Sequence, residues 1–222
     1  MSYELVADGD LPARAGSALA LAVEPLGEGE ELTLGGVAES GWHQLVYVLD
    51  GELELGGATL SAGMAFLHDR ETPTTVRATT PARLAVFGAG PECDEHALLG
   101  ERVASARLDL GNAASATGRR SFQIMLGPEN GCARATMFVG VVPPGAAPWH
   151  FHQYDEIVYL LDGAASYHQA GGVQSMAAGS AVRIPPRTVH INENVSGADM
   201  RVLGVFTPAG SPAAAYLATD PR

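Results

Sequence analysis

The feature that most constrains the fold of this 222-residue chain is an internal repeat. The segment Val-Tyr-Val-Leu-Asp-Gly returns 112 residues later as Val-Tyr-Leu-Leu-Asp-Gly, and two shorter matches follow in the same order. The matching pairs are 46–51 with 158–163, 60–63 with 176–179, and 86–87 with 205–206. Their slowly growing offsets indicate a duplicated unit with small loop insertions. Each unit would span about 100 residues, which is enough for a hydrophobic core of its own.

Within each unit the local patterns are those of short β-strands joined by tight turns. Residues 52–55, Glu-Leu-Glu-Leu, alternate strictly, which indicates a strand with one solvated face. The apolar runs 135–142 and 200–206 have the length of strands buried on both faces. Asp-Gly or Asn-Gly hairpin signals stand at 50–51, 130–131 and 162–163. With 27 glycines and 14 prolines, these patterns predict an all-β protein with a small sandwich or barrel in each unit.

The repeat also predicts the domain organisation. We expect a first domain at 1–98, a linker at 99–118 and a second domain at 119–222. Around the start of the linker, at 92–106, Leu98, Leu99 and Val103 stand among charged residues at roughly helical spacing. This spacing predicts a short helix there.

Composition and charge exclude several classes of function. The formal net charge is -12 and the pI is about 4.9, which disfavours nucleic acid or an anionic membrane surface as a partner. No apolar run has the length of a membrane span, and the start Met1-Ser2-Tyr3-Glu4 lacks the features of a signal peptide. The two cysteines, Cys93 and Cys132, match no disulfide framework, zinc motif or redox motif. We therefore expect a cytoplasmic protein.

The residues with the clearest chemical meaning are three histidines and a glutamate in the second unit. In a strand, residues i and i+2 point to the same face, so His150 and His152 can bind one ion together. Glu156 has the same parity, and His190 follows on another predicted strand. Three neutral imidazoles and one carboxylate suit one divalent transition metal per chain, without distinguishing Fe, Mn, Ni, Zn or Cu. The alternative is a structural polar cluster, although burying so many ionisable groups without a metal is costly.

At these positions the sequence resembles the cupin superfamily. The two stretches that carry the resemblance are Gly145-x4-His150-x-His152-x3-Glu156-x6-Gly163 and Gly179-x5-Pro185-x-Arg187-x2-His190-x3-Asn194. The first is one residue shorter than the usual motif, and Arg187 replaces its usual glycine in the second. The resemblance implies a bicupin, with two double-stranded β-helix (jelly-roll-like) barrels in one chain. It also implies that the metal ligands are His150, His152, Glu156 and His190.

The first barrel lacks the corresponding ligands. Carried back by the repeat offsets, the four ligand positions become Ala38, Ser40, Gln44 and Thr74. We therefore expect a degenerate first barrel that binds no metal, with a role in packing, in dimerisation or in covering the other barrel.

Other polar residues are candidates for contact with a ligand. Asn192 and Asn194 share the parity of His190 and would line the substrate pocket, although hydrogen bonding to nearby backbone is an equal alternative. Arg119 and Arg120 would clamp an acidic substrate or remain a solvated pair. Arg187 stands near the expected pocket mouth or is simply a solvated turn residue.

The resemblance leaves three functions open. The first is a metal-dependent, dioxygenase-type oxygenase acting on a small organic or aromatic substrate. The second is a non-redox metalloenzyme, namely an isomerase, lyase, cyclase or hydrolase in which the metal is a Lewis acid. The third is a non-catalytic cupin that binds a small ligand. We expect an enzyme whose partner is a small-molecule substrate, and a homodimer is also compatible with the sequence.

Overall fold

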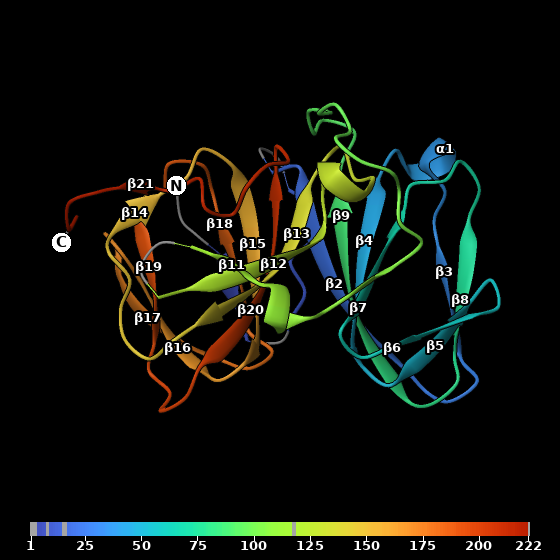
Figure 1. The fold of residues 1–222 in the computed structure, drawn as a ribbon, viewed down its shortest axis with the longest axis horizontal. Helices are drawn as coiled ribbons and strands as arrows, with labels where there is room; N and C mark the ends of the chain where they lie inside the picture. The colour runs from blue at the N-terminus through green and yellow to red at the C-terminus, as the bar shows by residue number, and fades with distance from the viewer. Residues whose placement is uncertain (1–3, 8, 15–16, 117–118, 222) are drawn as a thin grey trace.

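The computed structural model describes residues 4–7, 9–14, 17–116 and 119–221, which form two β-rich halves lying side by side (Figure 1). Each half has one larger and one smaller sheet, and the described strand pairs are antiparallel. The predicted all-β, jelly-roll-like fold is therefore confirmed. Across the described part of the chain, every helix is too short or too polar to traverse a bilayer.

The first half contains a five-stranded sheet in the order β10-β7-β4-β9-β2 and a four-stranded sheet in the order β3-β8-β5-β6. The strands of the larger sheet are β2 (Leu19–Leu26), β4 (His43–Asp50), β7 (Met64–His68), β9 (Ala82–Ala89) and β10 (Ala106–Arg107). Those of the smaller sheet are β3 (Glu31–Leu34), β5 (Glu52–Leu55), β6 (Ala58–Ser61) and β8 (Thr74–Ala78). A single helical turn, α1 (Val37–Ser40), leads into β4.

The second half contains a seven-stranded sheet, β1-β18-β15-β20-β13-β12-β11, and a five-stranded sheet, β17-β16-β19-β14-β21. The strands of the larger sheet are β1 (Glu4–Val6), β11 (Ala114–Ser115), β12 (Ser121–Leu126), β13 (Thr136–Val142), β15 (Asp155–Asp162), β18 (Ala181–Ile184) and β20 (Met200–Thr207). Those of the smaller sheet are β14 (His150–Phe151), β16 (Ala164–Gln169), β17 (Gly172–Ala177), β19 (His190–Asn194) and β21 (Tyr216–Leu217). Two 3-10 turns, η1 (Leu110–Asn112) and η2 (Pro128–Asn130), complete the regular structure.

Three hydrophobic clusters hold these sheets together. One lies inside the first half and one inside the second, each between the larger and the smaller sheet. The third lies between the halves, where Tyr47 and Phe87 of one large sheet pack in the same cluster as Tyr159 and Val205 of the other. Each large sheet is therefore buried on both faces, which explains the apolar runs in its central strands.

The strand register repeats between the halves in the way the sequence repeat predicts. Strand β4 lies between β7 and β9, as β15 lies between β18 and β20, and both have a register shift just before their final aspartate. In the first half Arg83 Nε lies 2.6 Å from the Asp50 carboxylate, and Arg201 and Asp162 pair in the same way in the second. The repeat is thus a repeat of structure as well as of sequence.

The segment at 92–106 differs from the sequence prediction because it forms no helix. Its backbone N–H groups donate to carbonyls of the second half instead, from His96 to Ala133 at 3.0 Å and from Leu99 to Pro128 at 2.8 Å. Leu98 and Leu99 are exposed, so they do not form the buried apolar face that a helix would need.

Strand pairing connects the three expected ranges 1–98, 99–118 and 119–222. Strand β1, from the first of these ranges, pairs with β18 of the second half. Within the expected linker, β10 joins β7 and β11 joins β12. The linker thus belongs to the sheets of both halves.

Arg183 on β18 fastens the N-terminal segment to the second half. Its side chain is completely buried, and its guanidinium donates hydrogen bonds to the carbonyl oxygens of Leu19 and Pro12, both at 2.8 Å. It also donates to the Ser17 hydroxyl, which in turn donates to the Asp155 carboxylate at 2.5 Å. Burial without these partners would be costly, so the segment and the arginine stabilise each other.

Replacing Arg183 with leucine should destabilise the protein by about 3–5 kcal/mol, because the buried Asp155 carboxylate and several carbonyl groups lose their charged partner. Denaturant unfolding of the full chain measures this change. The control is Arg83→Leu, which breaks a half-exposed ion pair and should cost less than about 1 kcal/mol. Equal effects of the two substitutions would contradict the role given to Arg183.

Candidate metal centre

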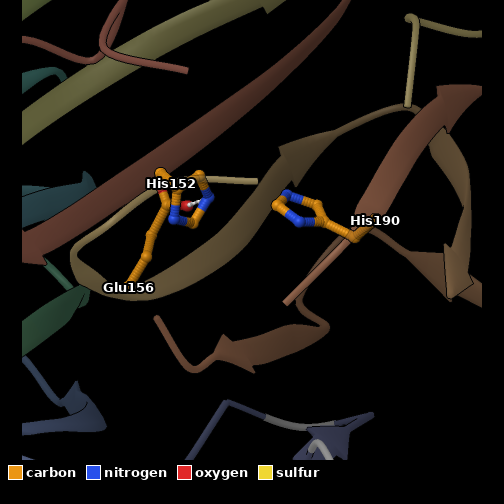
Figure 2. A group of neighbouring side chains, drawn as sticks. All are labelled: His152, Glu156 and His190. Carbon is orange, nitrogen blue, oxygen red and sulfur yellow. Dashed lines mark ion pairs between the residues drawn. The ribbon is translucent and has the colours of Figure 1, made fainter. Parts of the chain in front are cut away.

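The predicted ligands come from both sheets of the second half and converge in its interior. His150 is the first residue of β14, His152 follows that strand, Glu156 is on β15, and His190 is the first residue of β19. His150 and His190 are paired across the two adjacent strands. Figure 2 shows the His152 ring beside the Glu156 carboxylate, with the His190 ring directed toward them.

Three of these side chains form a group with the dimensions of a metal site. One ligand atom from each of His152, Glu156 and His190 lies within 4.8 Å of the others, and all three residues are buried. His152 Nε2 is 2.9 Å from Glu156 Oε2. His150 lies outside this group, but its ring centroid is 4.6 Å from that of His190. The four-ligand set remains a prediction, with His150 as its fourth member.

Backbone carbonyl groups orient all three imidazoles. Nδ1 of His150 lies 3.0 Å from the Pro148 oxygen, and Nδ1 of His190 lies 2.8 Å from the Thr188 oxygen. The Tyr154 oxygen is 3.3 Å from His152 Nδ1. A carbonyl oxygen only accepts hydrogen bonds, so the Nδ1 atoms of His150 and His190 carry the proton and their Nε2 atoms keep a lone pair. This is the tautomer that a metal ligand needs.

Burial favours the neutral forms of His150 and His190. Desolvation holds the pKa of His190 well below its usual value, and the neighbouring His150 and His152 lower it further. Desolvation also lowers the pKa of His150, against the raising effect of its hydrogen bond to Pro148. Neutral nitrogen donors beside a carboxylate suit a divalent first-row metal, so the residues present fit such an ion.

The ligands line a cavity of about 90 Å³. Aromatic and aliphatic side chains form much of its wall, and Arg120 and Asn192 add polar groups. The Asn192 side-chain oxygen is buried and has no hydrogen-bond partner. Burial lowers the pKa of Arg120, and the nearby Glu156 opposes this shift. The lining residues are Ala116, Arg120, Ser121, Phe122, Phe138, Gly140, Val141, Val142, His150, His152, Tyr154, Glu156, Val158, His190, Asn192, Val202, Pro212 and Ala215.

The two asparagines predicted for the pocket have different positions. Asn192 lines the cavity, whereas Asn194 does not. The Asn194 amide nitrogen donates to the carbonyl groups of Val142 and Ala198, and its oxygen accepts from the backbone and hydroxyl of Ser196. The bonds with Ser196 and Ala198 close a backbone turn, and the bond to Val142 joins this turn to β13. Asn194 therefore has a structural role outside the cavity lining.

Arg187 keeps the backbone conformation of the glycine that it replaces in the motif. Its φ of 62° lies in the left-handed region, which a side chain tolerates at a modest cost. Its N–H donates to the His152 carbonyl at 2.7 Å, and its Nε donates to Gln153 at 3.0 Å. The turn is therefore preserved, and Arg187 supports the loop that carries His152.

Tyr154 is a further residue of the site, and it has the same parity as His152 and Glu156. It lies in the turn between β14 and β15, directly before the first residue of β15. The ring lines the cavity and stacks on His152, with centroids 4.1 Å apart and planes at 10°. Burial raises the pKa of the Tyr154 hydroxyl far above its usual value, so the hydroxyl stays protonated.

Cys132 is fully buried, and burial raises the pKa of its thiol to about 11, which fits an inert thiol.

Comparison with known proteins now identifies this region. Residues 137–206 match the model of the cupin domain. This segment of the second half is a cupin domain. The match includes all four candidate metal ligands, from His150 on β14 to His190 on β19, and ends within β20. No curated protein matches the sequence.

Solved structures share the fold over both halves. A cupin 2 conserved barrel domain protein from Leptotrichia buccalis aligns with a TM-score of 0.61 at 14% identity, over 93% of this chain and 89% of its own. Oxalate decarboxylase from Bacillus subtilis aligns with a TM-score of 0.66 at 13% identity, over 97% and 77%. Salicylate 1,2-dioxygenase from Pseudoaminobacter salicylatoxidans aligns with a TM-score of 0.65 at 9% identity, over 86% and 68%. At these identities the likeness concerns the fold.

Substituting His190 with alanine should weaken metal binding by more than about 100-fold, because it removes a nitrogen donor from the group of three. Elemental analysis and titration with Mn(II) or Fe(II) measure the loss. His168→Ala is the matched control, since His168 lies in the same sheet but pairs with Glu193 at 2.7 Å. Full metal content in the His190 variant would refute the site.

The protein should keep its bound metal down to a pH below the pKa of an ordinary imidazole. The lowered pKa values of His150 and His190 mean that protons compete with the metal only below pH 6.5. Metal released across about pH 4 to 8, followed with a chromogenic chelator, tests this expectation. Loss of half the metal above pH 6.5 would contradict it.

Proposed function

We propose that the cupin domain is the catalytic part of a metal-dependent, dioxygenase-type oxygenase acting on a small organic or aromatic acid. The observation that carries the proposal is the convergence of the buried His152, Glu156 and His190 group with Arg120 around one small cavity. A bound divalent metal would supply Lewis-acid or redox chemistry at its open coordination positions.

The remaining residues of the cavity would bind and orient the substrate. Arg120 offers a charged fork that pairs with a carboxylate, and burial strengthens such an interaction. Asn192 offers an amide group with an unpartnered oxygen. Phe122 and Phe138 supply an apolar wall that excludes water and fits an organic or aromatic body. The volume of about 90 Å³ restricts the substrate to a small molecule.

A non-redox metalloenzyme is the second candidate, because the same donor set serves both chemistries. The likeness in fold to an oxalate decarboxylase supports this candidate, and the likeness to a salicylate dioxygenase supports the first. The difference is measurable, since only an oxygenase consumes O2 with its substrate. A cupin that only binds a ligand would neither consume O2 nor convert a substrate.

We further propose that the whole chain is a bicupin with a metal-free first barrel. The matching strand registers support this organisation, and Ser40 and Gln44 replace two of the ligands. A cytoplasmic location, the absence of nucleic-acid and membrane partners, and a homodimeric state are retained as predictions.

The test begins with the full chain purified without oxygen and loaded with Fe(II) or Mn(II). Each form is offered small aliphatic and aromatic carboxylic acids while O2 uptake and substrate loss are followed. Uptake in step with substrate loss supports the oxygenase, and turnover without O2 supports the second candidate. Absence of turnover with every acid and both metals would refute catalysis on this substrate class.

Arg120→Met should raise KM for a carboxylate substrate by roughly 10–100-fold, because the charge-assisted hydrogen bonds to the acid are lost. Arg119→Met is the matched control: its side chain is exposed and lies outside the lining of the metal cavity, so KM should change by less than about twofold. Steady-state kinetics on both variants at equal metal content decide the point. Equal effects would remove Arg120 from the substrate site.

A further inference from the structure

The first half contains a cavity at the position that the metal centre occupies in the second. The strand registers of the two larger sheets show which residues of the two halves are equivalent. In each larger sheet, three residues on neighbouring strands are paired in one row, which we call a rung. The rung that contains Glu156 also contains Phe206 and Thr136. The corresponding rung of the first half consists of Gln44, Gly88 and Ala20. On the next rung, Val158, Gly204 and Phe138 correspond to Val46, Val86 and Ala22. Gln44 thus stands where Glu156 does.

This cavity is larger than the metal cavity because smaller side chains line it. Two phenylalanines that fill the second half, Phe138 and Phe206, correspond to Ala22 and Gly88 in the first. The space lined by Ala20, Ala22 and Gly88 measures about 540 Å³, against about 90 Å³ for the metal cavity. The lining residues are Asp10, Pro12, Ala20, Leu21, Ala22, Gly35, Ser40, Trp42, Gln44, Val86 and Gly88.

Trp42 provides a flat apolar wall in this cavity. Its ring lies against the backbone of Gly88, where a Cβ atom would approach the ring to 2.7 Å. Glycine is therefore required at position 88 for the indole to keep its place. The ring is partly exposed and lines the cavity, so it offers a surface on which an aromatic molecule can stack.

The polar groups of the cavity restrict the charge of its occupant. The Gln44 side-chain oxygen is buried and has no hydrogen-bond partner, which leaves an acceptor for a ligand donor. Among the described lining residues none is basic, and the carboxylate of Asp10 stands at the cavity. This lining disfavours an anion, and the residues at the four ligand positions give no metal site.

From these observations we infer that the first half is a second binding site, for a neutral, largely apolar aromatic molecule. Its ring stacks on Trp42 and fills the space beside Ala22, and its hydroxyl or N–H group donates to Gln44. The site differs from the metal centre in both charge preference and size, and it does not depend on the proposed enzymatic activity.

The experiment uses the metal-loaded full chain and 2-naphthol, a neutral aromatic probe with one hydrogen-bond donor, followed by titration calorimetry. We expect saturable binding of one equivalent, with at least tenfold weaker binding of 2-naphthoate because of its charge. Gln44→Leu should weaken 2-naphthol binding about fivefold, since it removes the acceptor.

Filling the cavity separates this site from the metal centre. Ala22→Leu should weaken 2-naphthol binding at least tenfold while metal content and thermal unfolding midpoint stay near their original values. Ala22→Phe, the residue found at the equivalent position of the second half, provides a larger change at the same place. Ala58→Leu makes the same alanine-to-leucine exchange at an exposed site on β6 and should leave affinity unchanged within twofold. Undiminished binding in both Ala22 variants, or no saturable binding by the original protein, would overturn the inference.

Discussion

The packing of the two large sheets against each other is the constraint on which the rest of the molecule depends. One face of each sheet lines the interior of its own half, and the other face is buried against the opposite half. Removing either half would expose the shared cluster that contains Leu45, Phe87, Ile157 and Leu203. The first half thus covers the outer face of the sheet that carries Glu156.

Within that framework the candidate metal centre is organised before any ion binds. Backbone carbonyl groups fix the tautomers of His150 and His190, and stacking between His152 and Tyr154 fixes the plane of the third ring. Tyr154 in turn stacks on Phe206, with centroids 4.1 Å apart, so the orientation of a ligand is tied to the hydrophobic core. Such a site requires little reorganisation when a metal enters, because desolvation already favours the neutral forms of His150 and His190.

Sequence patterns predicted the fold class and the convergence of the ligands well. The repeat predicted the equivalence of β4 and β15, and i, i+2 parity placed His150 and His152 in the right region. The patterns failed where tertiary contacts override local preference: 92–106 has helical spacing but gives its backbone donors to the second half. Asn194 shares the parity of His190, but its side chain closes a turn at the end of the strand.

Some features had no signal in the sequence. Arg120 is one of two adjacent arginines, and only the path of the chain decides which of them reaches the cavity. Arg183 lies in a short apolar strand, where its partners are backbone carbonyls of a segment far away in the sequence. The open space of the first half results from two small residues on neighbouring strands, and it becomes visible only when the registers of both halves are known.

The crossing of β1 from the first half into the large sheet of the second has a consequence for how the protein can be divided. A fragment beginning in the linker would lack β1, so β18 would become an edge strand with unpaired backbone groups. Such edges recruit strands from other molecules. Residues Glu4–Val6 thus cover an edge of the second half's large sheet, and the cupin domain defined by sequence matching does not include the strand that covers this edge.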